Sequence, residues 1–110
     1  MTRALEALRV ARDIVREGWT RGCAARDAAG RPCLLTAFAA VRFCAVAALA
    51  KCGGYDNGVN AARWLFRAVP DWRRDDFSEW EDEPLRTHAE VIAAFDAAIS
   101  LCSSASDWRQ

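Results

Sequence analysis

The side chains that could do chemistry in this chain are its one histidine, His88, and its five cysteines, of which Cys44 lies in the most apolar stretch. A cysteine beside a histidine can act as a nucleophile–base pair. A reactive cysteine needs a lowered pKa, which a helix start or a nearby cation provides. If residues 36–52 form one helix, Cys44 lies two turns inside it, where a thiolate is disfavoured. The sequence therefore predicts that Cys44 is a small core side chain and not a nucleophile.

His88 follows Thr87 in the first turn of a predicted helix, where the positive end of the helix dipole disfavours a protonated imidazole. A neutral imidazole can bind a metal ion, and Glu90 could add oxygen ligands. Zinc, however, takes three or four ligands, whereas the chain has one histidine and no CxxC pair. We therefore expect no metal and no cofactor, and His88 to be a surface or capping-region histidine. A small enzyme or metal-dependent protein that uses His88, Glu90 and Cys44 is the alternative hypothesis.

Aromatic and charged side chains alternate in the segment 71–86, DWRRDDFSEWEDEPLR. One interpretation is an irregular loop whose aromatic residues pin it to the body while its carboxylates stay in water. The functional interpretation is a contact surface for a protein partner, since aromatic residues among charges are typical of protein interfaces. The predicted contact residues are Trp72, Arg73, Arg74, Phe77, Trp80 and Asp82. The tip of a predicted hairpin, described below, is the second choice.

Charge and length narrow the class of protein. Fifteen basic residues balance fifteen acidic residues, so the chain lacks the broad positive charge on which nucleic-acid binding usually depends. Apolar residues make up 53% of the 110 residues, which suits one globular domain over 1–110. The chain opens on a charged amphipathic segment instead of an apolar leader, and its cysteine count is odd. We expect a cytoplasmic protein with reduced cysteines.

The stretch 36–52, TAFAAVRFCAVAALAKC, is predicted to be a helix buried on all sides. Thr36 is expected to cap it and Gly53 to end it, with Phe38 and Val41 in one buried stripe. A membrane span is the rival interpretation. Seventeen residues rise about 25 Å as a helix, less than the ~30 Å of the hydrocarbon core. Arg42 would also lie near the middle, so we expect a core helix and no membrane segment.

The remaining pattern predicts a mainly α fold, a compact four-helix domain with a short β-hairpin between helices 1 and 2. The hairpin pairs 23–26 with 31–34, and Asp27 faces Gly30 across a type I turn. In that register Cys23 and Cys33 point to opposite faces, so we expect no disulfide between them. The other three helices are predicted over 2–17, over 58–69 after a GGYDNG loop, and from Thr87, with a frayed tail from about 103. The helices over 36–52 and from Thr87 are expected to form the core and the other two to flank it.

The strongest local signal is Thr87-His88-Ala89-Glu90, a capping box in which Thr87 and Glu90 each bond the other's backbone N–H. Four motifs in this order, GWTRG (18–22), ARDAAGRP (25–32), FCAVAAL (43–49) and RTHAEVIAAFDAAI (86–99), resemble a family of small bacterial and phage-encoded domains of unknown function. The chain has Phe43-Cys44 where a tryptophan–cysteine pair is expected. The resemblance covers most of the chain and supports the fold and the boundaries, but it implies no activity.

These observations predict a non-enzymatic module that binds or regulates a protein partner. The evidence against catalysis and the aromatic residues among charges both favour this function. Because relatives are expected in phages, an inhibitor of a host defence enzyme is a concrete version of the hypothesis.

Overall fold

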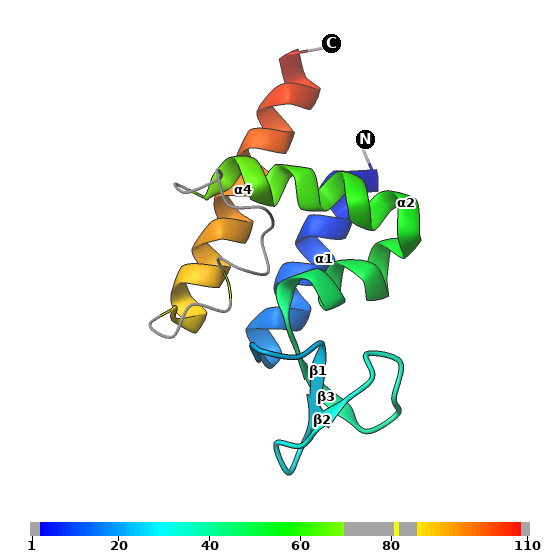
Figure 1. Ribbon diagram of the computed structural model, residues 1–110. Helices are drawn as coiled ribbons and strands as arrows, with labels where there is room; N and C mark the ends of the chain where they lie inside the picture. Colours follow the sequence, from blue (N-terminus) through cyan, green and yellow to red (C-terminus); the bar gives the residue numbers. More distant parts are fainter. Residues whose placement is uncertain (1–2, 70–80, 82–85, 109–110) are drawn as a thin grey trace.

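The computed structural model describes residues 3–69, 81 and 86–108, and it describes their side chains except those of 52–59 and 105–108. Helix α1 spans Arg3–Glu17, α2 spans Ala45–Ala68 and α4 spans His88–Trp108. A small sheet of β1 (Ala25–Asp27), β2 (Pro32–Cys33) and β3 (Ala40–Phe43) lies between α1 and α2 in the chain. Figure 1 shows this sheet at one end of the molecule, below the helices. The predicted mainly α class, with a small β element after the first helix, is confirmed.

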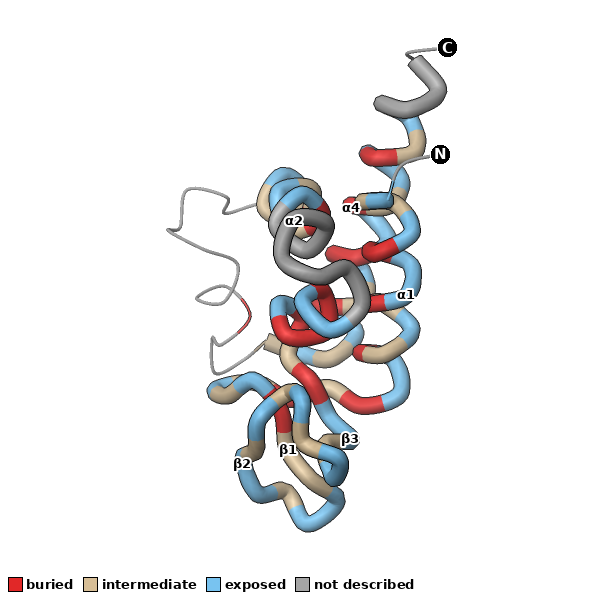
Figure 2. The backbone as a smooth tube through the Cα atoms, turned by 90° about the vertical axis from the view of Figure 1, so that its right-hand side faces the viewer, coloured by how far each residue is buried: buried red, intermediate tan, exposed pale blue. Residues whose placement is uncertain are grey.

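The core lies where α1, α2 and α4 meet, and their buried residues face one another in Figure 2. The first helix forms as its periodicity predicts, with Ala7, Leu8, Ala11 and Val15 buried. Its expected flanking position is wrong, because three of these side chains are fully buried in the shared core. On the other two helices the largest fully buried side chains are Leu49, Leu65, Val91, Phe95 and Cys102.

The hairpin of β1 and β2 forms, but its register differs by one residue from the expected one. Arg26 pairs with Pro32, and the N–H of Asp27 donates to the carbonyl of Arg31 at 3.0 Å. The turn therefore contains one more residue, Gly30, whose φ of 86° suits only glycine at low cost. This is the three-residue hairpin loop with a left-handed glycine. The prediction that Cys23 and Cys33 point to opposite faces of the hairpin depends on the wrong register. Both cysteines are nevertheless free, with no disulfide between them.

The third strand replaces the first half of the predicted helix over 36–52. Two consecutive turns lead from Leu34 to Ala40, and β3 then pairs antiparallel with β1, which becomes the middle strand. Thr36 is therefore not a helix cap. A short apolar run does not distinguish strand from helix by periodicity alone. Here β1 offers a partner on one side of β3 and the Gly18–Thr20 segment on the other, so pairing overrides the helix propensity of the alanines.

The second half of that predicted helix and the predicted helix over 58–69 are one helix, α2. The expected GGYDNG loop over 53–58 is helical, although glycine inside a helix costs ~1 kcal/mol relative to alanine. Burial of Leu49 near one end and Leu65 near the other offsets this cost. The two ends of α2 run in different directions (Figure 1). The helix stops ahead of Pro70, as predicted.

Helix α4 begins where the capping box predicts, directly after Thr87, and continues through the 103–108 segment expected to fray. Within the described ranges, no helix is both long and apolar enough to cross a membrane.

Candidate functional site

A buried carboxylate joins three parts of the fold. Glu81 is 1% exposed, and its Oε2 accepts hydrogen bonds from the indole Nε1 of Trp19 at 2.7 Å and from the backbone N–H of Ala45 at 2.8 Å. Ala45 is the first residue of α2, so the negative charge lies at the positive end of that helix. The sequence predicts that the acidic side chains of segment 71–86 lie in water. For Glu81 that prediction is wrong, because the carboxylate completes a helix start far away in sequence.

Cys44 is the N-cap of α2 and not an interior residue of a helix. Its Sγ accepts from the N–H of Ala47 at 3.4 Å, and its own N–H donates to the carbonyl of Ala24 at 3.0 Å. The side chain is half-buried. The predicted position two turns inside a helix is therefore wrong, and Cys44 does not lie in a helix interior, where a thiolate would be disfavoured. A helix N-terminus is where proteins stabilise thiolates.

His88 lies between the end of α1 and the chain that follows it. Its Nε2 is 2.7 Å from the carbonyl oxygen of Val15, and its ring stacks on Trp19 with ring centroids 5.7 Å apart. The ring is half-buried, and His88 lies in the first turn of the helix, the capping region that the sequence predicts. Trp19 thus contacts His88 through its ring face and Glu81 through its nitrogen.

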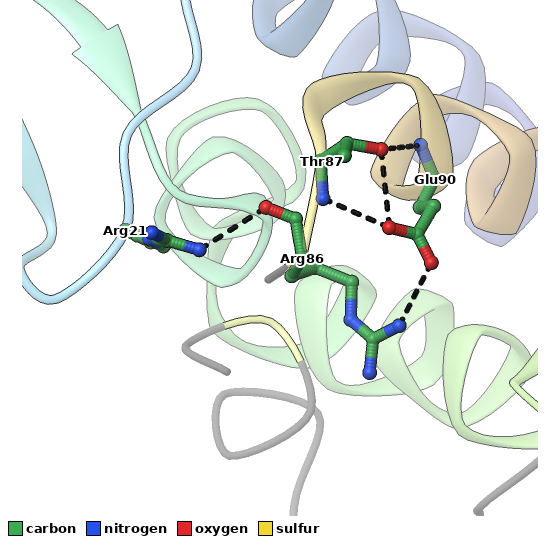
Figure 3. A network of polar contacts seen from close by, with 4 residues as sticks. All are labelled: Arg21, Arg86, Thr87 and Glu90. Atoms are coloured by element: carbon green, nitrogen blue, oxygen red, sulfur yellow. Dashed lines mark hydrogen bonds and ion pairs between the residues drawn. The ribbon is translucent and has the colours of Figure 1, made fainter. Parts of the chain in front are cut away.

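Glu90 faces different partners from its neighbour His88. Figure 3 shows the predicted capping box: Glu90 Oε1 accepts from the N–H of Thr87 at 3.0 Å, and Thr87 Oγ1 accepts from the N–H of Glu90 at 3.1 Å. Arg86 adds an ion pair to Glu90 at 3.0 Å. The hydrogen bond from the Thr87 backbone, then that from Arg86, lowers the pKa of Glu90. Arg21 donates to the carbonyl of Arg86 at 3.1 Å, which ties the start of α4 to the chain before β1.

The GWTRG motif supplies three of these contacts, from Trp19 to Glu81 and to His88 and from Arg21 to Arg86. A Cβ on Gly18 would lie 2.4 Å from the carbonyl oxygen of Val41, so only glycine allows α1 to end against β3. Trp19 binds Glu81 as described. Thr20 Oγ1 accepts from Arg26 Nε at 2.7 Å, and Arg26 also donates to the carbonyl of Gly30 at 2.9 Å. The motif therefore connects α1, the sheet and the helix starts, which is a structural role.

Three large apolar side chains are exposed on the connection between β2 and β3 and on β3 itself. Leu34 is 75% exposed, Phe38 is 107% exposed and Val41 is 48% exposed. We call these three residues the lobe surface. The predicted burial of Phe38 and Val41 in one stripe is wrong, because the helix that would bury them does not form. Short apolar runs that can turn into strands are the only signal that could have indicated this surface.

The predicted contact residues Trp72, Arg73, Arg74, Phe77, Trp80 and Asp82 lie outside the described residues. The hairpin tip, the second choice, carries the exposed Arg31, which bonds Asp27 at 3.1 Å. In the part of the chain that the structure covers, no three histidine, cysteine, aspartate or glutamate side chains gather as a metal site would require.

Together these features define a small, mainly helical domain with a three-stranded antiparallel sheet between its first two helices. The chain belongs to a family of unknown function, DUF6197, which matches residues 1–101. No curated protein and no solved structure matches it.

Proposed function

We propose that this domain is a non-enzymatic module that binds a protein partner through the lobe surface. One observation carries the proposal: Phe38 is as exposed as in an extended chain, with Leu34 and Val41 exposed nearby. Single exposed apolar residues are ordinary, but here three occur within eight residues of the chain. A phenylalanine buries roughly 150 Å² or more when covered, which makes it an efficient interface anchor. The connection between β2 and β3 and strand β3, which carry these residues, lie at the end of the molecule where the sheet is (Figure 1).

The contacts of Glu81, Cys44 and His88 support a non-enzymatic function indirectly. The groups that could do chemistry there also hold the fold together: Glu81 accepts from the first N–H of α2, Cys44 caps that helix, and His88 lies against the end of α1. Contacts with fixed backbone groups are what a structural centre requires.

We further propose, as predicted from the sequence, that this is a cytoplasmic protein of bacterial or phage origin. A concrete version is that it inhibits a host defence enzyme. The segment that holds Trp72 and Trp80 is a second contact region, proposed on sequence grounds alone.

Site-specific photo-crosslinking tests the proposal. A benzoylphenylalanine at position 38, in the full chain expressed in its source cells, should form an adduct of defined mass. The same group at Val10, an exposed apolar position on α1, is the matched control and should form none. Adducts from both positions, or from neither, would contradict a contact at the lobe surface. Phe38→Ser should change the free energy of unfolding by less than about 0.5 kcal/mol, so loss of binding to the captured partner in this variant would not reflect unfolding.

A thiol-dependent activity is the second candidate, and it is the sequence-based alternative with His88, Glu90 and Cys44. One observation favours it: Cys44 lies at a helix start and not inside a helix. Alkylation by iodoacetamide, followed residue by residue with mass spectrometry, compares Cys44 with Cys33, which is also half-buried. Much faster reaction at Cys44 would favour the thiol chemistry, and equal rates would leave Cys44 as a cap.

A further inference from the structure

Building on the proposed function, we propose the chemistry of the partner: an acidic protein surface with an apolar recess that receives Phe38. The first ground is the distribution of charge along the chain. Residues 20–43, which form the sheet and its connections, contain four arginines (Arg21, Arg26, Arg31 and Arg42) and one acid, Asp27, a net charge of +3. The whole chain is neutral, so the other residues together carry −3.

Within residues 20–43, two of the basic side chains are more exposed to solvent than the acidic one. The Asp27 side chain is only 16% exposed, and it accepts hydrogen bonds from the N–H groups of Ala29 and Arg31, so its charge is directed into its own turn. The Arg31 side chain that pairs with it is 80% exposed. Arg42 is exposed next to Val41, and within the described part of the chain no carboxylate pairs with it. The one acid of this region is covered while two of its arginines project outward.

A segment that exposes both apolar and basic side chains matches one half of a protein interface, which has an apolar centre and a polar rim. Arginine is suited to such a rim because its planar guanidinium binds carboxylates through two parallel hydrogen bonds. Nucleic acid is the weaker fit. Single strands bind by stacking bases on aromatic rings, and Leu34 and Val41 offer no ring. The charge of −3 on the rest of the domain would also repel a phosphate backbone.

The partner that crosslinking at position 38 identifies is purified without the crosslink. Its Kd for the intact domain is then measured by calorimetric titration. Attraction between surface charges is screened by salt, so Kd should rise about tenfold or more between ~50 and ~300 mM salt. The double variant Arg31→Gln/Arg42→Gln should weaken binding about tenfold and flatten the salt dependence. The matched control Arg9→Gln/Arg63→Gln removes the same charge from exposed helix positions and should bind like the parent.

The outcomes separate the two proposals. If position 38 captures no partner, the proposed function fails and this inference fails with it. If a partner is captured but its affinity is independent of salt and equal for both double variants, only the acidic chemistry is wrong. Binding of a dT20 oligonucleotide or of phosphatidylglycerol vesicles that is lost in Phe38→Ser would also overturn the inference, because the lobe surface would then serve nucleic acid or lipid. Phosphatidylcholine vesicles are the uncharged control.

Discussion

The indole nitrogen of Trp19 donates a 2.7 Å hydrogen bond to the carboxylate of Glu81, a residue 62 positions later in the chain. The same carboxylate oxygen accepts a hydrogen bond from the backbone N–H of Ala45. The buried Glu81 carboxylate therefore connects the segment that follows α1 with the start of α2. A buried charge is costly unless it is hydrogen-bonded, and here the donors are an indole and a helix N-terminus.

Glu81→Ala should be among the most destabilising substitutions. It leaves the half-buried Trp19 indole and the buried Ala45 N–H without this acceptor, at a cost of about 3 kcal/mol. Trp19→Phe removes one donor and should cost about 2 kcal/mol. Urea unfolding of both single variants and the double variant should give a coupling energy near 1 kcal/mol or more, since the residues are in contact. Strict additivity would show that the hydrogen bond contributes nothing, and Glu6→Ala on the exposed face of α1 serves as the control.

Gly18→Ala tests the close approach of α1 and β3. The new methyl group would meet the backbone oxygen of Val41, and a backbone cannot move as a flexible side chain can. We expect a loss of about 1–3 kcal/mol in unfolding free energy. Gly22→Ala is the comparison, because its cost arises from a φ of 82° with nothing within 4 Å, and it should be about 1–2 kcal/mol. A Gly18→Ala variant as stable as the parent would mean that α1 and β3 can separate.

Thr87→Ala should cost about 1 kcal/mol, because it removes the acceptor for the N–H of Glu90 and leaves the helix start short of a partner. Thr87→Ser keeps the hydroxyl and should retain most of the stability. Hydrogen exchange at the Glu90 amide would report the loss locally. Equal exchange in both variants would contradict the capping role.

Stability should fall in acid for an identifiable reason. The pKa of Asp27 is lowered chiefly by the hydrogen bond from the Arg31 backbone, and that of Glu90 chiefly by the hydrogen bond from the Thr87 backbone. Because both folded pKa values lie below the ordinary ones, 3.8 and 4.5, the stabilisation is fully present above those values and is lost as pH falls through the folded pKa. Urea midpoints should therefore drop below pH 4.5. In the double variant Asp27→Asn/Glu90→Gln the urea midpoint should decrease less below pH 4.5. The same decrease as in the parent would contradict the role of these two carboxylates in acid destabilisation.

The sequence predicts the structure correctly where the signal lies in neighbouring residues. The period of α1, the turn at Asp27 and the capping box at Thr87 are each decided by neighbouring residues, and all three form. The prediction fails where pairing across the chain decides. The run around Phe38 and Val41 is compatible with a helix until β1 offers a strand partner, and Cys44 is not a residue type that indicates a helix start. Glu81 could not be distinguished from the surrounding acids, because its burial depends on Trp19 and Ala45.

The layout of the sheet also determines how another molecule can engage it. On the outer side of β3, Phe43 already exchanges backbone hydrogen bonds with Gly18 and Thr20. On the opposite side, β2 has two residues, one of them Pro32, which lacks an N–H. Neither border presents a row of open donors and acceptors to which an extended peptide could add a strand. Recognition at this end of the domain must then be read from side chains, so sequence changes at Leu34, Phe38 and Arg42 can alter partner choice while the backbone stays the same.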